Sequence, residues 1–142
     1  MDNLRIEKTW SDNDFFEINI KGSNEFITCE QNIYVAFESI STICTKLFEY
    51  VNQPNKALYF ESGDKTGAYT PAISVNILPA ELTGTILIEL DMEIEDNDER
   101  RHRAVFYVKT DKFNLKSFSE KLEKYILKDT KIGFSSELNS VF

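Results

Sequence analysis

The chain is poor in the residues from which catalytic and metal sites are usually built. Its 142 residues include one histidine and two cysteines. His102 is expected to face the core near the end of a hairpin, and neither Cys29 nor Cys44 lies near it in the sequence. Neither the Cys-x-x-Cys nor the His-x-x-x-His spacing of a metal site occurs. We therefore predict no catalytic residue, no metal site and no cofactor, and the sequence favours a protein that is not an enzyme.

Positive charge is also scarce. The 16 Lys and Arg residues stand against 24 Asp and Glu residues, which leaves a net charge of -8. Nucleic acid is disfavoured as a partner because phosphate binding needs clustered Lys and Arg, and an anionic membrane surface is disfavoured for the same reason. An acidic surface fits plain solubility, and it fits a basic protein partner equally well.

Long apolar runs are missing. No segment approaches the roughly 18 apolar residues of a membrane helix, and the first residues lack the apolar core of a secretion signal. Reduced cysteines and a cytoplasmic location are therefore expected. Because no repeat or low-complexity segment divides the chain, residues 1–142 are expected to form a single domain. Residues 129–142 are expected to be a loosely attached tail with a short strand near 132–134.

What the chain does have is a long alternation of apolar and mostly acidic residues over 86–95. A period of two is typical of a strand with one face on a core and the other in water. The run 101–109 can pair back onto it as a hairpin. Pairing Ile94 with His102 places the apolar residues of both strands on one face, whereas a shift by one residue would disrupt both faces.

The outward face of this hairpin carries a row of carboxylates. The row consists of Glu89, Asp91, Glu93 and Glu95. Paired carboxylates can bind cations or perform acid–base chemistry, but the register sets Arg103 opposite Glu93 and Arg101 opposite Glu95. The face is then either a solvated surface with ion pairs or a protein-binding surface, and we assign the row as the predicted protein-binding site.

The remaining pattern predicts the α+β class. Strands are expected at residues 4–10, 15–21, 25–30, 57–61 and 73–77, and helices at 37–52 and 115–127. Their order favours a single antiparallel sheet of about six to seven strands with both helices on one face. Asn114 is the expected N-cap of the second helix, with Phe113 and Phe118 as a hydrophobic staple. In the third strand, Phe26 is expected opposite Ile20.

Two further features lie outside the core pattern of these elements. Residues 62–71 form a polar, glycine-containing segment that we interpret as a connecting loop. The aromatic residues that fall outside the core pattern either anchor an interface or fill the far side of the sheet. They are Trp10, Phe15, Tyr34 and Tyr69.

The order and texture of these elements resemble those of a family of bacterial immunity proteins. The resemblance spans about residues 14–127 and includes the helix 37–52 and the strand Leu58-Tyr59-Phe60. It also includes the segment Val105-Phe106-Tyr107-Val108-Lys109-Thr110-Asp111 before Leu115-x-x-Phe118-x-x-x-Leu122. The chain looks like the WapI-like immunity partners of polymorphic toxins. This resemblance implies a cytoplasmic, non-enzymatic protein that blocks a toxin domain by binding, and it carries over no site residue.

The sequence therefore predicts a protein-binding domain, specifically an immunity-type inhibitor that meets a basic toxin domain through its acidic sheet face. The expected partner is another protein, basic in charge, and neither nucleic acid nor a membrane. The alternative is a small-ligand-binding domain with a pocket between helix 37–52 and the sheet. The oligomeric state is left open.

Overall fold

The strands form two antiparallel sheets rather than one. The computed structural model of the chain describes residues 2–64, 69–94, 99, 101–128 and 135–139. The elements are β1 (Asn3–Ser11), β2 (Phe15–Ser23), β3 (Thr28–Ala36), α1 (Phe37–Asn52), β4 (Leu58–Asp64), β5 (Tyr69–Ile77), β6 (Thr85–Ile94), β7 (His102–Asp111), α2 (Lys112–Lys121), a π-helical segment η1 (Leu122–Lys128) and β8 (Ser135–Asn139). Sheet A has the order β3-β2-β1-β8, and sheet B has the order β4-β5-β6-β7. The α+β class is confirmed, but the prediction of a single sheet is wrong.

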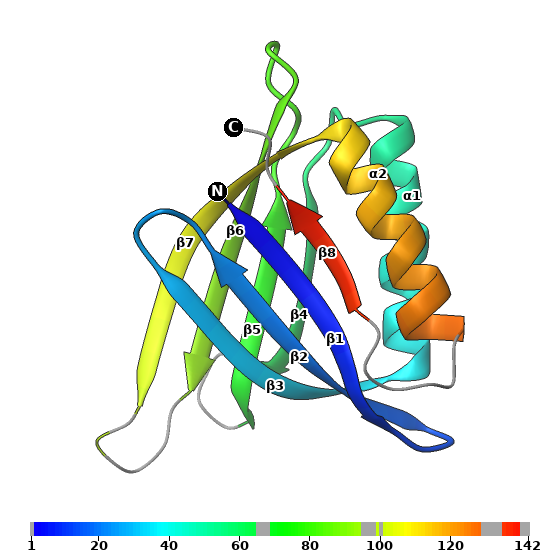
Figure 1. The fold of residues 1–142 in the computed structure, drawn as a ribbon, viewed down its shortest axis with the longest axis vertical. Helices are drawn as coiled ribbons and strands as arrows, with labels where there is room; N and C mark the ends of the chain where they lie inside the picture. Colours follow the sequence, from blue (N-terminus) through cyan, green and yellow to red (C-terminus); the bar gives the residue numbers. More distant parts are fainter. Residues whose placement is uncertain (1, 65–68, 95–98, 100, 129–134, 140–142) are drawn as a thin grey trace.

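The two sheets cover each other's apolar faces. Each sheet alternates buried apolar and outward polar residues, so each needs a cover on one side. Sheet A lies in front of sheet B in Figure 1, and the strands of one cross those of the other. Helices α1 and α2 pack against each other along one open side of this pair. A single sheet is not formed because the chain leaves sheet A after β3 and enters α1, and β4 then pairs only with β5.

Helix α1 closes the interior as its periodicity predicts. It spans Phe37–Asn52, the predicted range. The apolar stripe is buried at Ile40, Cys44, Leu47 and Val51, whereas Phe37 at its start is 46% exposed. The stripe faces the interior between the sheets because residues three and four apart share one side of a helix.

One corner of the interior is closed by direct contact between the sheets. A Cβ atom at Gly22 would overlap Leu90 Cδ1 and would lie 3.1 Å from Phe106 Cζ. Glycine is therefore needed on β2 where its backbone meets the side chains of β6 and β7. Ile6, Ile18 and other buried aliphatic residues of the two sheets belong to the core beyond this corner.

The turn between β2 and β3 lies later in the chain than expected. Asn24 Oδ1 accepts hydrogen bonds from the backbone N–H groups of Phe26 at 2.9 Å and Ile27 at 3.1 Å. These bonds fix a turn across residues 24–27, in the way that asparagine side chains commonly do. Ile20 consequently pairs with Gln31 instead of Phe26. Phe26 is 86% exposed at the end of the hairpin.

The second helix begins earlier than predicted. Asp111 is its N-cap, and Asp111 Oδ1 accepts from the backbone N–H of Asn114 at 2.8 Å. Asn114 is therefore not the cap, and the staple is also wrong because Phe113 is 79% exposed. Phe118, Leu122 and Ile126, which lie four residues apart on one side, are buried. This buried stripe continues from α2 into η1.

A lysine that the sequence pattern does not reveal is buried against η1. Lys8 on β1 is 1% exposed. Its Nζ donates to the carbonyl of Ile126 at 3.0 Å and lies 4.7 Å from the centre of the Phe16 ring. The last carbonyl groups of a helix have no hydrogen-bond partner within it. The lysine satisfies one of these groups and ties β1 to η1.

Strand β8 forms one edge of sheet A, and β7 forms one edge of sheet B. β8 pairs with β1, with Leu138 opposite Leu4; the strand expected near residues 132–134 lies outside the described residues. At the far edge of sheet B, Asn24 Nδ2 donates to the carbonyl of Tyr107 at 3.0 Å, and Asp2 Oδ2 accepts from the N–H of Lys109 at 2.8 Å. Neither described helix is long and apolar enough to cross a membrane.

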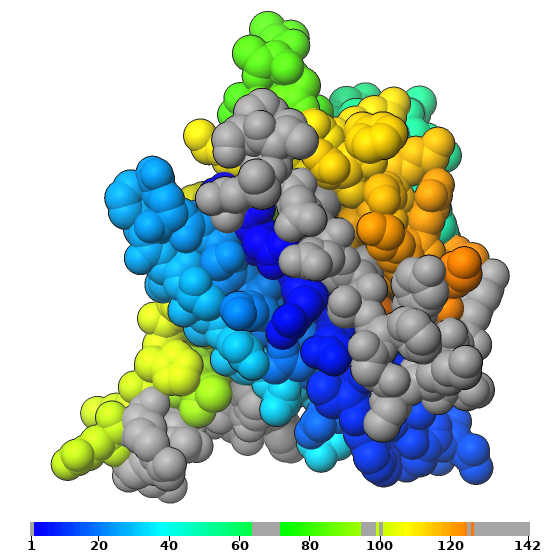
Figure 2. All heavy atoms as spheres, in the orientation of Figure 1, coloured from blue at the N-terminus to red at the C-terminus, as the bar shows by residue number. Residues whose placement is uncertain are grey.

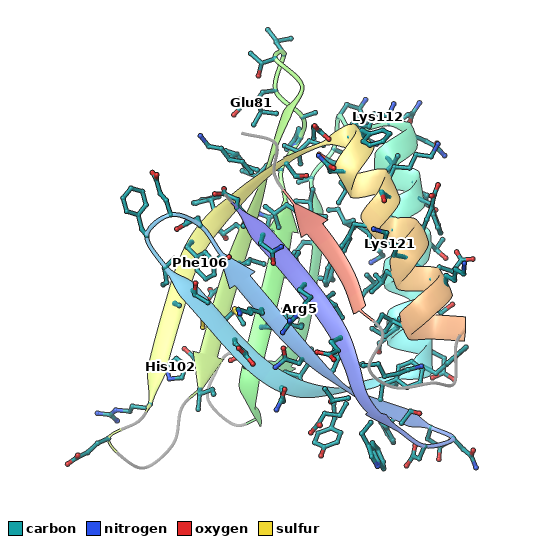
Figure 3. All side chains as sticks on the ribbon, in the orientation of Figure 1. Arg5, Glu81, His102, Phe106, Lys112 and Lys121 are labelled. Atoms are coloured by element: carbon teal, nitrogen blue, oxygen red, sulfur yellow. The ribbon has the colours of Figure 1, made fainter. Side chains whose placement is uncertain are left out.

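The space-filling view shows sheet A as a broad face beside α2, with the loop between β5 and β6 projecting from one end (Figure 2). This loop carries Leu82, which is fully exposed. In Figure 3, Arg5 lies on the front of sheet A and Glu81 lies in the projecting loop. The face of sheet B that is turned away from sheet A is not visible in this view, and it carries the predicted acidic row.

Candidate protein-binding face

The predicted hairpin is present with the predicted register. Ile94 pairs with His102, Leu90 with Phe106, and Glu93 with Arg103. Leu90 and Phe106 are buried, so the apolar face points toward sheet A. Glu89, Asp91 and Glu93 lie on the opposite side, which we call the outer face of sheet B. Glu95 lies outside the described residues, and its pairing with Arg101 stays a prediction.

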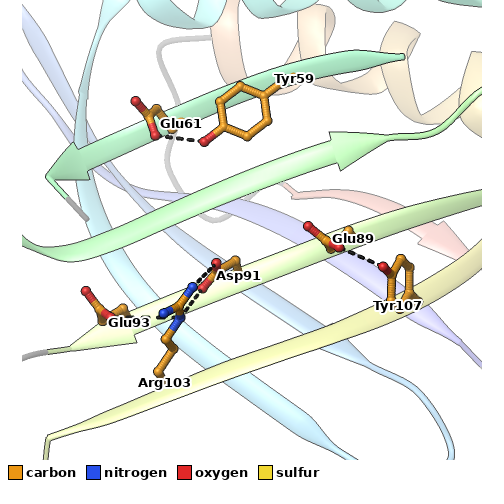
Figure 4. A network of polar contacts seen from close by, with 7 residues as sticks. All are labelled: Tyr59, Glu61, Glu89, Asp91, Glu93, Arg103 and Tyr107. Atoms are coloured by element: carbon orange, nitrogen blue, oxygen red, sulfur yellow. Dashed lines mark hydrogen bonds and ion pairs between the residues drawn. The ribbon is translucent and has the colours of Figure 1, made fainter. Parts of the chain in front are cut away.

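Asp91 is held by a strong pair with Arg103. Arg103 Nη2 donates to Asp91 Oδ2 at 2.8 Å and Arg103 Nε donates to Asp91 Oδ1 at 3.0 Å, which is the two-pronged geometry of a guanidinium on a carboxylate (Figure 4). The carboxylate is almost fully buried, whereas the Arg103 side chain is 57% exposed. The hydrogen bonds and charge of Asp91 raise the pKa of Arg103 above its ordinary value. Asp91 therefore supports the face and offers little surface to a partner.

Glu93 lies at the margin of this pair. Its Oε2 is 3.9 Å from Arg103 Nε, and its side chain is 14% exposed. Glu93 Oε1 is buried and has no hydrogen-bond partner among the described residues. The shorter contacts of Arg103 go to Asp91, so Glu93 contributes its charge with little direct bonding.

Two tyrosines complete the face by donating to carboxylates. Tyr107 donates from its hydroxyl to Glu89 Oε2 at 2.7 Å, and Tyr59 donates to Glu61 Oε2 at 2.8 Å (Figure 4). The hydrogen bond to Glu89 and the charge of that carboxylate raise the pKa of Tyr107. Both hydroxyls are held by the bonds, so the rings lie in fixed positions on β4 and β7.

Apolar surface is exposed on the same face. Tyr59, Val105 and Tyr107 are 49%, 52% and 43% exposed. Sequence reasoning did not assign these residues to the site. The signal was present for Val105 and Tyr107, because they alternate with the buried Phe106 and Val108 on β7. Tyr59 belongs to a different hairpin, and only the sheet order places it two strands from β6.

The face keeps a negative balance. On the described stretches from Tyr59 to Glu61, Leu87 to Glu93 and Arg103 to Lys109, the outward carboxylates are four: Glu61, Glu89, Asp91 and Glu93. The outward cations on the same stretches are Arg103 and Lys109. The face can therefore attract a basic surface and offer aromatic contact area to it.

His102, Cys29 and Cys44 were considered as catalytic or metal-binding residues in the sequence. The structure does not bring them together into a site. His102 lies at the beginning of β7, and its pairing with Ile94 places it on the core side as expected, but it is exposed at this end of the strand (Figure 3). Cys29 and Cys44 are not joined in a disulfide, and burial raises the pKa of the Cys29 thiol. Among the described residues no cluster of His, Cys, Asp and Glu side chains could hold a metal ion.

The predicted loop over residues 62–71 is shorter than expected. β4 continues to Asp64 and β5 begins at Tyr69. The strands stay paired through Asp64 and Tyr69, with an irregularity after Ser62. Residues 65–68 lie outside the described part of the chain.

A second group of exposed aromatic residues lies on the outer face of sheet A. The rings of Trp10 and Tyr34 meet edge to face with their centres 6.2 Å apart. Glu17 lies between them in the register, opposite both residues. Phe15 is 49% exposed nearby at the start of β2. Trp10, Phe15 and Tyr34 therefore lie outside the core; the side chain of Tyr69 is not among those described.

An apolar cavity of about 140 Å³ lies between the two sheets and α1. Its walls include Ile33 of β3, Ile40 of α1, and Ile73 and Val75 of β5. An empty space of this size would destabilise the fold by about 3 kcal/mol at roughly 24 cal/mol per Å³. The cavity is in the place where the alternative sequence interpretation expected a pocket, between residues 37–52 and a sheet.

Comparisons with protein-family models, with curated proteins and with solved structures find no significant match to this chain. The function is therefore argued from the geometry of the two candidate regions, the outer face of sheet B and the cavity.

Proposed function

We propose that this chain is a non-enzymatic protein-binding domain, an immunity-type inhibitor that neutralises a basic toxin domain through the outer face of sheet B. The observation that supports this best is the exposure of Tyr59, Val105 and Tyr107 around a row of carboxylates. Tyrosine and arginine are enriched at the energetic centres of interfaces, and charged surroundings select the partner. The resemblance to immunity proteins supports a toxin as the target and the cytoplasm as the compartment.

The residues of this face have different expected roles in binding. Glu61 and Glu89 stand at its surface and would attract the partner, whereas Asp91 is buried and orients Arg103. Tyr59 and Tyr107 are held in place by their bonds to these carboxylates, so little side-chain freedom is lost on binding. The expected anchors are therefore the two rings and Val105, with the carboxylates controlling the association rate.

The experiment compares two charge-reversed variants. Glu61→Lys with Glu89→Lys changes the outer face of sheet B. Glu38→Lys with Glu120→Lys makes the same change of net charge at exposed positions on α1 and α2. A protein captured from the native host by the wild type and by the helix variant, but lost from the face variant, is the expected partner.

Binding kinetics with that partner then test the mechanism. The face variant is expected to associate at least about tenfold more slowly than the wild type, with a smaller change in dissociation. The wild-type association rate should fall steeply as salt is added, because screening shortens the reach of the charges. A partner that the face variant binds as fast as the wild type does would contradict the proposal.

Tyrosine substitutions locate the anchors. Tyr107→Ala is expected to raise the dissociation rate at least about fivefold, the range of an interface anchor. Tyr34→Ala removes an exposed ring from the outer face of sheet A and serves as the matched control. If Tyr34→Ala weakens binding and Tyr107→Ala does not, the partner docks on sheet A.

A further inference from the structure

The cavity is a consequence of how the two sheets meet. At Gly22 the sheets are in direct contact through Leu90 and Phe106. Toward α1 the side chains that line the interior leave a volume of about 140 Å³ unfilled. The interior walls are aliphatic or aromatic. They include Ile33, Ile40, Ile73, Val75 and Phe118.

Polar residues occur only where the cavity approaches the surface. Within the described part of the chain these lining residues are Tyr34, Ser39, Glu61 and Ser62, from the end of β3, the first turn of α1 and β4. The Tyr34 hydroxyl bonds to Glu17 on the outer face of sheet A, and Glu61 accepts from Tyr59 on the outer face of sheet B. The polar groups of Tyr34 and Glu61 are thus engaged outside the cavity, and two serine hydroxyls remain at the rim.

This arrangement determines what the cavity could hold. No charged group among the described residues lines the interior, so a buried ionic group on a ligand would have no partner and would be strongly disfavoured. An apolar cavity of about 150 Å³ in another protein stays dry and binds benzene. The space here has a similar volume, and water inside it would find few hydrogen-bond partners.

We propose that the cavity between the sheets and α1 is a binding site for a compact, neutral, apolar molecule about the size of one six-membered ring. A single hydroxyl on that molecule could reach Ser39 or Ser62 at the rim. Among the described residues, the site shares only Glu61, at its rim, with the proposed binding face, and this proposal does not depend on the protein-binding function.

Methyl NMR of the full chain with benzene tests the proposal directly. Saturable shifts are expected at the methyl groups of Ile33, Ile40 and Ile73, which line the cavity. Ile86 and Ile126 are fully buried outside the lining and serve as internal controls. Benzoate, which has the same ring with a charge, is expected to give no saturable response. Benzene should also raise the midpoint of thermal unfolding, because it binds only the folded state.

Two substitutions change the volume in opposite directions. Val75→Phe should fill the space and weaken benzene binding at least tenfold. Because that variant could fail to fold, Ile33→Ala provides a second measurement: by enlarging the cavity it should bind n-butylbenzene at least tenfold more tightly than the wild type does. Ile86→Ala makes the same change at a buried position that does not line the cavity, and it should not gain this larger ligand.

Three results would overturn the proposal. One is the absence of a saturable benzene response in the wild type. Another is a response that is equal at the lining and control isoleucines, or equal for benzene and benzoate. The third is a gain of n-butylbenzene binding by Ile86→Ala as large as that by Ile33→Ala.

Discussion

Side chains on both sides of β6 are buried, but they are stabilised by different interactions. Leu90 is completely buried against sheet A, and Asp91, its neighbour on the opposite side, is only 5% exposed. Leu90 meets apolar atoms across the interior, whereas Asp91 meets the guanidinium of Arg103. A strand in which apolar and polar residues alternate therefore need not have one buried face and one solvent-exposed face. The outward side can bury a charge when a neighbouring strand supplies its partner.

The largest expected effect comes from placing a charge on the inner side. Leu90→Asp should lower the free energy of unfolding by at least about 3 kcal/mol, because it buries a carboxylate without a partner and removes apolar contacts. Leu90→Met keeps the volume and should cost less than about 1.5 kcal/mol. Urea denaturation measures both. Equal losses for the two variants would show that the inner side tolerates polarity.

A smaller effect is expected where the sheets touch. Gly22→Ala should destabilise the fold by about 1–3 kcal/mol, since the new Cβ overlaps Leu90 and forces the sheets apart. Gly84→Ala is the comparison, because Gly84 has φ of +89° and no atom within 4 Å of the added Cβ. There the loss is backbone strain of about 1 kcal/mol. If the Gly84 variant loses more stability, close packing at Gly22 is not the stronger constraint.

Tyrosine titration compares a buried tyrosine of α1 with a tyrosine on the outer face of sheet B. Burial raises the pKa of Tyr50, which donates to the Leu78 carbonyl, to about 12. The pKa of Tyr107 is raised by its bond to Glu89. Because both values are raised, these tyrosines add stability below the ordinary tyrosine pKa, and it is lost as the pH rises through the raised values.

Ultraviolet titration of Tyr50→Phe and Tyr107→Phe assigns each transition. Glu89→Gln should move the Tyr107 pKa back toward its ordinary value, because it removes the neighbouring negative charge, and should leave Tyr50 unchanged. A shift of the Tyr50 pKa in Glu89→Gln would mean that Glu89 is electrostatically coupled to this tyrosine of α1.

The smallest expected effect lies on the outer side. Glu93→Gln should change the free energy of unfolding by less than about 1 kcal/mol, because its ion pair with the exposed Arg103 is weak at 3.9 Å. The amide keeps the shape of the side chain, and Asp91 retains its two bonds to Arg103. A loss similar to that of Leu90→Asp, measured in the same urea series, would reverse the assignment of the two faces.

Local periodicity predicted the parts of the fold that depend on nearby residues. The bounds of α1 and the pairing of Ile94 with His102 follow from periods of 3.6 and two, because a wrong register would expose one apolar face. The division into two sheets was not predictable in this way, since it depends on β3 not pairing with β4. The cap of α2 was missed because Asp111 and Asn114 are both suitable cap residues, three positions apart.

Alternation predicted which side of β6 carries the carboxylates, but it did not predict all the residues and contacts of the candidate face. Alternation placed Glu89, Asp91 and Glu93 outward. It could not show that Arg103 bonds mainly to Asp91, a diagonal neighbour, rather than to Glu93 directly opposite. The contribution of Tyr59 depends on the order of strands in sheet B, which no local pattern contains. The cavity likewise depends on the distance between two sheets.

The side chains along the outer edge of β7 have a consequence for self-assembly. An uncovered edge strand offers a row of backbone groups onto which a strand from another molecule can add. Asn24 and Asp2 occupy two of those groups, the carbonyl of Tyr107 and the N–H of Lys109. A neighbouring copy cannot extend sheet B at this point without displacing both side chains. At this point of the β7 edge, addition of a strand from another molecule is therefore disfavoured.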